Sequence, residues 1–327
     1  MEFPCCVTSP CFVLDGSDTV KVLVTGGAGY VGSVLVPQLL ESGYEVVVYD
    51  SLRYGGHALL PLFRHNTFSF IKGDVCDKDA IQAAVSDCDA VVHLAAIVGY
   101  PACRKYPVDA QQTNVEGVRT LVEILGANQI LIHASTGSNY GQLDTICTEE
   151  SPLNPLTLYG ETKTEGERIA LTLPNATALR FATAFGVSPR MRLDLLINDF
   201  VRMAVQDKQI IVYERHFRRS IVHVFDMARA VIFALDNIDR MRGEPFNVGH
   251  ESMNLTKGDI ANRIRASVHF YLHFAEIGTD ADQRDYEVSY QKIRDLGFET
   301  TVTIDEGIDQ LVRAMEAVQL VNPYGNL

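Results

Sequence analysis

A glycine-rich turn near the start of the chain constrains the fold more than any other feature. Gly26, Gly29 and Gly32 follow the apolar run VKVLVTG and precede VGSVLVPQLLESG, whose apolar spacing predicts a helix that ends near Gly43. The next run, YEVVVYD, predicts a second strand. Glycines between a strand and a helix allow a dinucleotide pyrophosphate to approach the helix N-terminus. The alternative is an ordinary glycine-rich turn.

Strand-like and helix-like segments continue to alternate as far as Gly186. Apolar strands are expected at FSFIKGD, DAVVHLAA, QILIHAS and ATALRFATAFG, with helices at residues 79–86, 108–127 and 158–171. This alternation predicts a Rossmann-type α/β fold, a doubly wound parallel sheet with helices on both faces. Beyond Gly186, shorter strands mixed with helices at residues 193–206, 225–237 and 305–317 predict a smaller mixed α/β lobe that binds the substrate.

Three regions follow from this pattern. Residues 1–19 lack periodicity and are expected to form a loose extension, which carries Cys5, Cys6 and Cys11 without indicating what they do. A dinucleotide-binding domain is expected at residues 20–186. Residues 187–327 are expected to form mainly the substrate lobe, and the chain can cross back to the first domain.

Composition and charge exclude several classes. With 327 residues, 47% hydrophobic and 21% charged, the chain is typical of globular proteins. Its net charge of −13 disfavours nucleic acid and anionic membranes as partners. Residues 180–220, however, carry eight basic against four acidic side chains, which indicates a small anionic ligand.

The sequence also favours a cytoplasmic protein without a metal site. No apolar run reaches the roughly 18 residues that a membrane-spanning helix needs, and no secretory signal is evident. Seven cysteines without metal-ligand spacing predict reduced thiols. His269 and His273 have i, i+4 spacing, but VHFYLHF is strand-like and lacks the glutamate of a zinc helix, so no metal is expected.

Acidic residues after two strands indicate which dinucleotide binds. Asp50 ends the second strand eighteen residues after Gly32, where a carboxylate accepts hydrogen bonds from the adenosine ribose and repels a 2′-phosphate. NAD is therefore expected rather than NADP, although Arg53 could offset the repulsion. Asp74 and Val75 follow the third strand and are expected at the adenine edge. A turn cap is the other interpretation of Asp74.

A tyrosine and a lysine share one face of a predicted helix. Tyr159 and Lys163 have i, i+4 spacing. A phenol with an ordinary pKa near 10 needs a nearby cation and a hydrogen-bond donor to act as a base near neutral pH. Lys163 can supply the charge, and Thr136 at the end of the fifth strand can supply a hydroxyl. Taken alone, the Tyr/Lys spacing often occurs by chance and more often marks solvated helix surface.

The order of the glycine turn, Thr136 and the Tyr159/Lys163 pair resembles the extended short-chain dehydrogenase/reductase family, specifically its nucleotide-sugar epimerases and dehydratases. Further motifs carry the resemblance from about residue 20 to residue 307. These motifs are HLAA at 93–96, TNVEG around Asn114, IVHVFDMARA at 221–230 and FNVG at 246–249.

The resemblance implies a role for each matching residue. Tyr159 would be the acid/base, Lys163 would bind the nicotinamide ribose and lower the tyrosine pKa, and Thr136 would bind the reacting sugar hydroxyl. The cofactor residues implied are Gly26, Gly29, Tyr30, Val31, Gly32, Asp50, Asp74, Val75, Leu94, Ala95, Ala96, Asn114, Tyr159 and Lys163. The substrate residues implied are Thr136, Thr183, Arg190, Arg219 and Arg284, with Arg219 and Arg284 on the diphosphate.

Two departures from the family pattern narrow the chemistry. Sugar dehydratases follow the catalytic threonine with Asp-Glu, whereas this chain has Gly137 and Ser138, so no carboxylate is expected to remove the C5 proton. Thr183 stands where the family usually places an asparagine that contacts the nucleotide sugar. The segments from CTEESPL through SPRMRLDLLINDF to RDYEVS resemble a narrower subgroup that includes GDP-heptose C4 oxidoreductases.

These observations predict an NAD-dependent epimerase or oxidoreductase acting at C4 of a nucleotide-linked sugar. Net epimerisation and net dehydrogenation or ketoreduction of a heptose or hexose stay open, because they use the same residues. A non-catalytic dinucleotide sensor is the alternative from a different class. A homodimer formed by the helices at 108–127 and 158–171 is expected, unless Val115, Val118, Leu121 and Val122 only face the core.

Overall fold

The computed structural model describes residues 19–143, 145–276 and 285–318, and its centre is a seven-stranded parallel sheet. The order is β10-β6-β5-β4-β1-β2-β3, with every neighbouring pair parallel. These strands are β1 Lys21–Thr25, β2 Glu45–Asp50, β3 Phe68–Lys72, β4 Ala90–His93, β5 Ile130–Thr136, β6 Ala176–Phe181 and β10 Pro245–Val248. The predicted Rossmann-type fold is confirmed.

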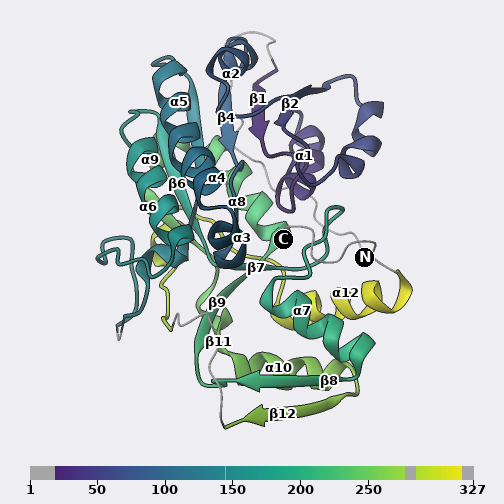
Figure 1. Cartoon of the computed structure of the whole chain (residues 1–327). Coiled ribbons are helices and arrows are strands. Elements are labelled where there is room, and N and C mark those ends of the chain that lie inside the picture. Colours follow the sequence, from purple (N-terminus) through teal and green to yellow (C-terminus); the bar gives the residue numbers. More distant parts are fainter. Residues whose placement is uncertain (1–18, 144, 277–284, 319–327) are drawn as a thin grey trace, which may run out of the picture.

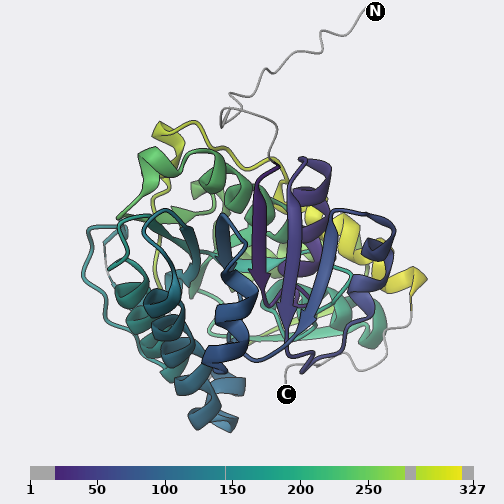
Figure 2. The same ribbon diagram turned by 90° about the horizontal axis from the view of Figure 1, so that it is seen from above.

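Helices cover both faces of the sheet, as Figure 2 shows from above. Their bounds are α1 Gly32–Glu41, α2 Lys78–Val85, α3 Tyr100–Lys105, α4 Pro107–Gln111, α5 Gly117–Ile124, α6 Leu158–Ala170, α8 Val224–Asp236, α9 Ile238–Met241 and α11 Gln291–Asp295. Short 3-10 turns lie at η1 His57–Arg64, η3 Gly137–Tyr140 and η5 Glu251–Met253. None of the helices in the described ranges is long and apolar enough to cross a membrane.

The alternation of side chains along each strand produces two cores. On β1, Val22 and Val24 pack in the core beneath α1 and α8, whereas Leu23 packs in the core beneath α2, α5 and α6. This is the period of two expected of a strand buried on both faces. The predicted end of the first helix at Gly43 is also confirmed, because Gly43 follows α1 with a φ of +89°.

The helix expected at residues 108–127 is interrupted. A π-helical turn, η2 at Gln112–Glu116, separates α4 from α5, and it carries the buried side chain of Asn114. Four apolar positions of this region face the protein's own core. Val115, Val118 and Leu121 are buried there and Val122 packs against it, so none of the four forms an outer surface.

A smaller lobe lies below the sheet in Figure 1. It contains a three-stranded sheet of β7 Thr183–Phe185, β9 Arg218–His223 and β11 Asn254–Thr256, and a parallel pair of β8 Gln209–Tyr213 and β12 Tyr271–Ala275. Its helical segments are α7 Leu196–Arg202, η4 Met203–Asp207, α10 Lys257–Ser267 and α12 Ile304–Ala317, around a separate apolar core. His273 lies on β12, as the strand-like spacing predicted.

The chain crosses between the two parts more than once. After β7, α7, β8 and β9, it returns with α8 against α1 and with β10 beside β6. It then re-enters the lobe with α10 and β12. Because all seven central strands are parallel, their carboxyl ends lie at one edge of the sheet, and the site is built there.

Candidate active site at the carboxyl edge of the sheet

A cavity of about 310 Å³ lies between the carboxyl edge of the sheet and the lobe. Most of the residues that the sequence assigned to the site line it. They are Gly26, Gly29, Tyr30, Val31, Gly32, Asp50, Asp74, Val75, Leu94, Ala95, Ala96, Thr136, Tyr159, Lys163, Thr183 and Arg190. The fold therefore gathers residues from the ends of five strands, β1 to β5, from α6 and from the lobe around one space.

The glycine turn leaves no room for larger side chains. Gly26 has a φ of +73°, and a Cβ there would lie 2.7 Å from the backbone nitrogen of Ala95. A Cβ on Gly32 would lie 2.5 Å from the Cα of Gly27. Helix α1 begins at Gly32 without an acidic residue in its first turn, so its positive end faces the cavity uncompensated. This arrangement fits the pyrophosphate of a dinucleotide.

Asp50 stands at the ribose position with both carboxylate oxygens held. Oδ2 accepts a hydrogen bond from the backbone N–H of Ala28 at 3.0 Å, and Oδ1 accepts one from Leu52 at 2.8 Å. Burial raises the pKa of the Asp50 carboxyl above its ordinary value, and these two backbone donors oppose the rise. The carboxylate is thus fixed in direction by the turn that follows β2.

The cation near Asp50 comes from the lobe. Arg53 donates to Asp109 at 2.8 Å and lies over the ring of Tyr106. Arg190 stacks over Tyr54, 4.5 Å from the ring centroid, and interacts electrostatically with Asp50. Arg190 therefore lies near Asp50, and its assignment to the substrate stays a prediction. Only folding of the lobe onto the sheet brings it there.

Asp74 caps a turn and also lines the cavity, while its place at the adenine edge stays a prediction. Its Oδ1 accepts from the backbone N–H of Cys76 at 2.9 Å, which makes it a turn cap. Its backbone carbonyl accepts from the hydroxyl of Tyr49 at 3.0 Å. Together with Val75 it also lines the cavity.

Asn114 supports the site from behind. Its Oδ1 accepts from the N–H of Ile97 at 2.8 Å, while its Nδ2 donates to the Ile97 carbonyl and to Thr162 Oγ1, each at 3.0 Å. It is fully buried and is not among the residues of the cavity wall. The expectation that Asn114 contacts the cofactor is therefore corrected: its amide is used to tie the loop after β4 to α6.

Helix α6 presents Tyr159 and Lys163 to the cavity. Thr157 caps its N-terminus by accepting from the N–H of Gly160 at 3.1 Å. Lys163 is only 4% exposed, and burial lowers its pKa to about 8, while the Glu167 carboxylate and Cys103 oppose that shift. At neutral pH the ammonium is therefore charged and faces the wall that it shares with Tyr159.

A buried ion pair fixes α6 to the sheet. Glu167, one turn after Lys163, is held by the Arg180 guanidinium with a closest approach of 2.6 Å. Ser135 and Asn139 also donate to Glu167 Oε2. Removing one partner of such a pair would leave an uncompensated buried charge, so this cluster holds the helix, and with it Tyr159, in place.

The residues after β5 carry no carboxylate. Thr136 Oγ1 donates to Ser138 Oγ at 3.2 Å and accepts from the Ser138 N–H at 3.1 Å. Gly137 has no side chain, and a Cβ there would lie 3.3 Å from the hydroxyl of Tyr286. The acidic residues among the described lining residues are Asp50 at the end of β2 and Asp74 after β3.

The structure brings only part of the predicted substrate set to the cavity. Thr183 on β7 lines it. Arg219 is buried in β9, where Nη1 donates to the carbonyl of Arg218 at 2.8 Å, and it is not part of this wall. Arg284 lies outside the described residues.

Sequence reasoning missed Arg192, which lines the cavity from the lobe. Its guanidinium makes a two-pronged ion pair with Asp194. Its sequence signals are weak: it belongs to the cationic stretch at 180–220 and to a charged R-x-D pattern in SPRMRLD, which has no periodicity and no typical spacing for a site. Within the described ranges, no group of three or more metal-ligating side chains comes together.

Comparisons with known proteins agree with this geometry. The model of the NAD dependent epimerase/dehydratase family matches residues 22–249. The chain belongs to this family. A dTDP-glucose 4,6-dehydratase of Streptomyces niveus is 30% identical over 313 residues, which cover 90% of this chain and 92% of that protein.

Solved structures extend the likeness to the whole fold. The dTDP-glucose 4,6-dehydratase of Streptomyces venezuelae, solved with NAD, is 28% identical with a TM-score of 0.80, covering 91% of this chain and 98% of that one. A UDP-glucuronic acid 4-epimerase variant of Bacillus cereus, also solved with NAD, is 25% identical with a TM-score of 0.81, covering 91% and 99%. The cofactor is NAD, in agreement with the glycine turn and Asp50, and the protein is an enzyme of this nucleotide-sugar epimerase/dehydratase family.

Proposed function

We propose that this protein is an NAD-dependent epimerase or oxidoreductase that acts at C4 of a nucleotide-linked sugar through a 4-keto intermediate. The observation that carries the proposal is one wall that joins the glycine turn, Thr136, Tyr159 and Lys163. Related proteins include dTDP-glucose 4,6-dehydratases and UDP-glucose 4-epimerases, which supports a nucleotide sugar as substrate.

Each residue has a separate task in the proposed reaction. Thr136 orients the C4 hydroxyl, and the ionised phenol of Tyr159 removes its proton. The Lys163 ammonium stabilises the phenolate and binds the nicotinamide ribose. NAD, when bound, supplies the acceptor for the hydride that leaves C4. The alcohol thereby loses a proton and a hydride and becomes a ketone.

Two outcomes use this same half-reaction. If the keto sugar turns over in the cavity and hydride returns to its other face, Tyr159 gives the proton back and the product is the C4 epimer. If the keto sugar leaves, the net reaction is dehydrogenation, and its reverse is ketoreduction. The residues on the wall serve both equally.

The acid–base residues argue against dehydration. Loss of water across C5 and C6 requires a group that removes the C5 proton, and a carboxylate does this in sugar dehydratases. Beside Thr136 this chain has Gly137 and Ser138, while Asp50 and Asp74 belong to the adenosine end. The 30% identity to a dehydratase therefore supports the binding of a nucleotide sugar but not the elimination step.

The test is to incubate the enzyme with GDP-, UDP-, CDP- and dTDP-linked hexoses and heptoses. NADH absorbance and product stereochemistry are followed together. An epimer without net NADH indicates an epimerase, whereas stoichiometric NADH indicates a dehydrogenase. A 4-keto-6-deoxy product would overturn the proposal, and absence of turnover with every sugar would favour the dinucleotide sensor.

The homodimer and the domain assignment belong to the same proposal. Val108 at the start of α4 is 66% exposed, so a dimer through α4, α5 and α6 would use such outward residues instead of the four that face the core. Sedimentation at micromolar concentration tests the homodimer, and a monomer contradicts it.

We also propose that residues 20–186 form the NAD domain and that residues 187–327 form mainly the substrate lobe. We further propose a cytoplasmic location, which cell fractionation tests.

A further inference from the structure

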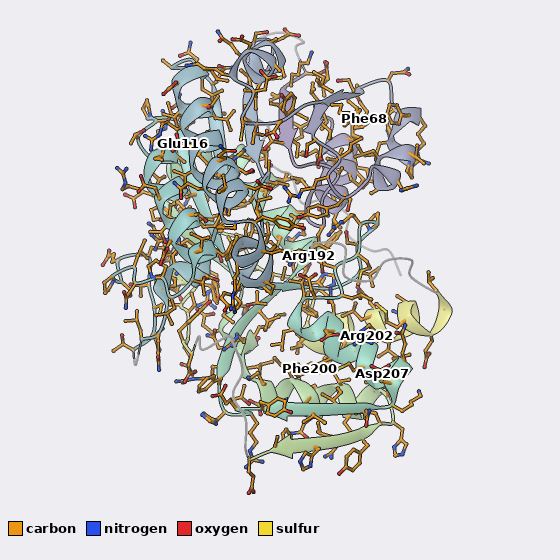
Figure 3. All side chains as sticks on the ribbon, in the orientation of Figure 1. Phe68, Glu116, Arg192, Phe200, Arg202 and Asp207 are labelled. Carbon is orange, nitrogen blue, oxygen red and sulfur yellow. The ribbon has the colours of Figure 1, made fainter. Side chains whose placement is uncertain are left out.

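Arg192 reaches from the lobe to the reaction end of the cavity. Figure 3 shows it at the junction between the sheet part and the lobe, whereas Arg202 lies within the lobe. Its side chain is 9% exposed. Nε donates to Asp194 Oδ1 at 3.1 Å and Nη2 to Oδ2, while its backbone carbonyl accepts from Asn198 Nδ2 at 2.8 Å. The guanidinium is therefore held in one orientation.

The Nη2 end of this guanidinium also lies near the loop before α3, beside the wall that carries Tyr159. A Cβ on Gly99 would lie 3.5 Å from Arg192 Nη2. Gly99 precedes α3, and Tyr159 packs against the apolar cluster that Cys103 of α3 forms with Ile97. Both Arg192 and Tyr159 line the cavity, and the two side chains interact electrostatically. Asp194 accepts hydrogen bonds from Nε and Nη2 of Arg192. Within the described ranges, no acceptor is found for Nη1 of Arg192.

Among the groups around Tyr159, a second cation would help to stabilise the ionised phenol. On its own helix lies Lys163, whose ammonium begins to lose its proton near a pKa of about 8. From α3, Cys103 is neutral because burial raises its pKa to about 11. The β5 end supplies the neutral Thr136 and Ser138. Glu167 lies a further turn along α6 and is neutralised by Arg180.

The lobe supplies the remaining charges. Arg192 interacts electrostatically with both Tyr159 and Tyr30, and Asp194 interacts with Tyr30. A guanidinium stays protonated across the whole range in which proteins are stable. Arg192 therefore offers a cation that does not disappear when Lys163 deprotonates.

We propose that Arg192 is a positioning residue for Tyr159: held by Asp194, its guanidinium stabilises the ionised phenol together with Lys163. The inference rests on the proposed function, because that proposal makes Tyr159 the acid/base. It adds a residue from the lobe to the control of tyrosine ionisation.

The test is a titration of Tyr159 in the NAD-bound enzyme. Near-ultraviolet tyrosinate absorbance is recorded against pH for each protein and for the same protein carrying Tyr159→Phe, so that the difference isolates one phenol. In Arg192→Gln the apparent pKa of Tyr159 should rise by about one unit or more, because a cation is lost from a partly desolvated site. Arg192→Lys keeps a charge and should give a smaller rise.

The matched control is Arg202→Gln. Arg202 is a partly buried arginine of the same lobe that pairs with Asp199 and does not line the cavity, so the titration of Tyr159 should not move. If Arg192→Gln does not fold, the double variant Arg192→Gln/Asp194→Asn removes both charges of the pair and should raise the apparent pKa of Tyr159 in the same direction, but by less than the single variant. An unchanged Tyr159 titration in either folded variant overturns the inference.

The titration separates this inference from the proposed function, since it needs no sugar. If no nucleotide sugar turns over but Arg192→Gln shifts the titration, the proposed function fails and the electrostatic role stands. If a sugar is found, the alkaline shift should also appear in the pH profile of kcat. A loss of kcat that is equal at all pH values, with an unmoved titration, would assign Arg192 a purely structural role.

Discussion

The charge on Lys163 should destabilise the folded protein, although the proposed reaction requires that charge. Burial lowers its pKa from 10.5 to about 8. At about 1.36 kcal/mol per pKa unit, keeping this ammonium charged at pH 7 costs the folded state roughly 3 kcal/mol. Its side chain is nearly inaccessible, so solvent does little to reduce that cost. Lys163→Met keeps the length of the side chain and removes the charge. It should raise the free energy of unfolding by roughly 3 kcal/mol and abolish turnover.

The pH dependence of this effect has a definite sign. Between about pH 8 and pH 10.5 the unfolded chain holds a proton on Lys163 that the folded chain has released. The contribution of Lys163 to the free energy of unfolding of the wild type therefore rises with pH across that window. The gain in free energy of unfolding of Lys163→Met over the wild type should be complete below about pH 8. It should vanish as the pH approaches 10.5.

Urea unfolding of the NAD-free proteins at pH 7 and pH 10 measures the difference. Lys78→Met is the control, because Lys78 pairs with Glu123 on the surface and both side chains are about half exposed. Such a pair contributes at most about 1 kcal/mol, so this control should lose a little stability and gain none. Saturating NAD should stabilise the wild type more than Lys163→Met. The reasoning would be refuted if Lys163→Met were less stable than the wild type at pH 7. A stability difference between the two proteins that does not change with pH would also refute it.

Three further predictions test the cofactor and catalytic residues. Tyr159→Phe should lower turnover by about 10²-fold or more with unchanged NAD affinity, and Thr136→Ala should lose less because Thr136 only orients the hydroxyl. Steady-state rates and NAD titration check this, and a Tyr159→Phe enzyme that keeps more than about a tenth of wild-type turnover would assign the proton transfer elsewhere. Asp50→Ala should reduce the preference for NAD over NADP, because no carboxylate then repels a 2′-phosphate. If the ratio of the dissociation constants for NADP and NAD is the same in the variant and the wild type, this prediction is contradicted. Gly26→Ala should destabilise the protein more than Gly43→Ala, which costs about 1 kcal/mol. Both glycines have positive φ, but only a Cβ on Gly26 meets backbone, at 2.7 Å from Ala95 N, so equal losses in urea would be the refuting result.

Features encoded locally in the sequence were predictable. The period of two in β1 and β2, the glycines between β1 and α1, and the i, i+4 spacing of Tyr159 and Lys163 each depend on neighbouring residues along the chain. Parallel strands then place all carboxyl ends on one edge, which is why strand-end residues such as Asp50 and Thr136 could be assigned to one site. The identity of the cofactor and the shape of its turn follow from these segments alone.

Only the tertiary structure decided which distant segments meet that edge. Asn114 was expected on the cofactor, but its amide is used by Ile97 and Thr162. Arg190 was expected on the substrate, yet it lies beside Asp50, and Arg192 gave no periodic signal at all. The segment that carries both arginines has no helix or strand to set a spacing. Its position depends on the packing of the lobe core and on the Asp194 and Asn198 contacts, which are properties of the folded chain and not of neighbouring residues.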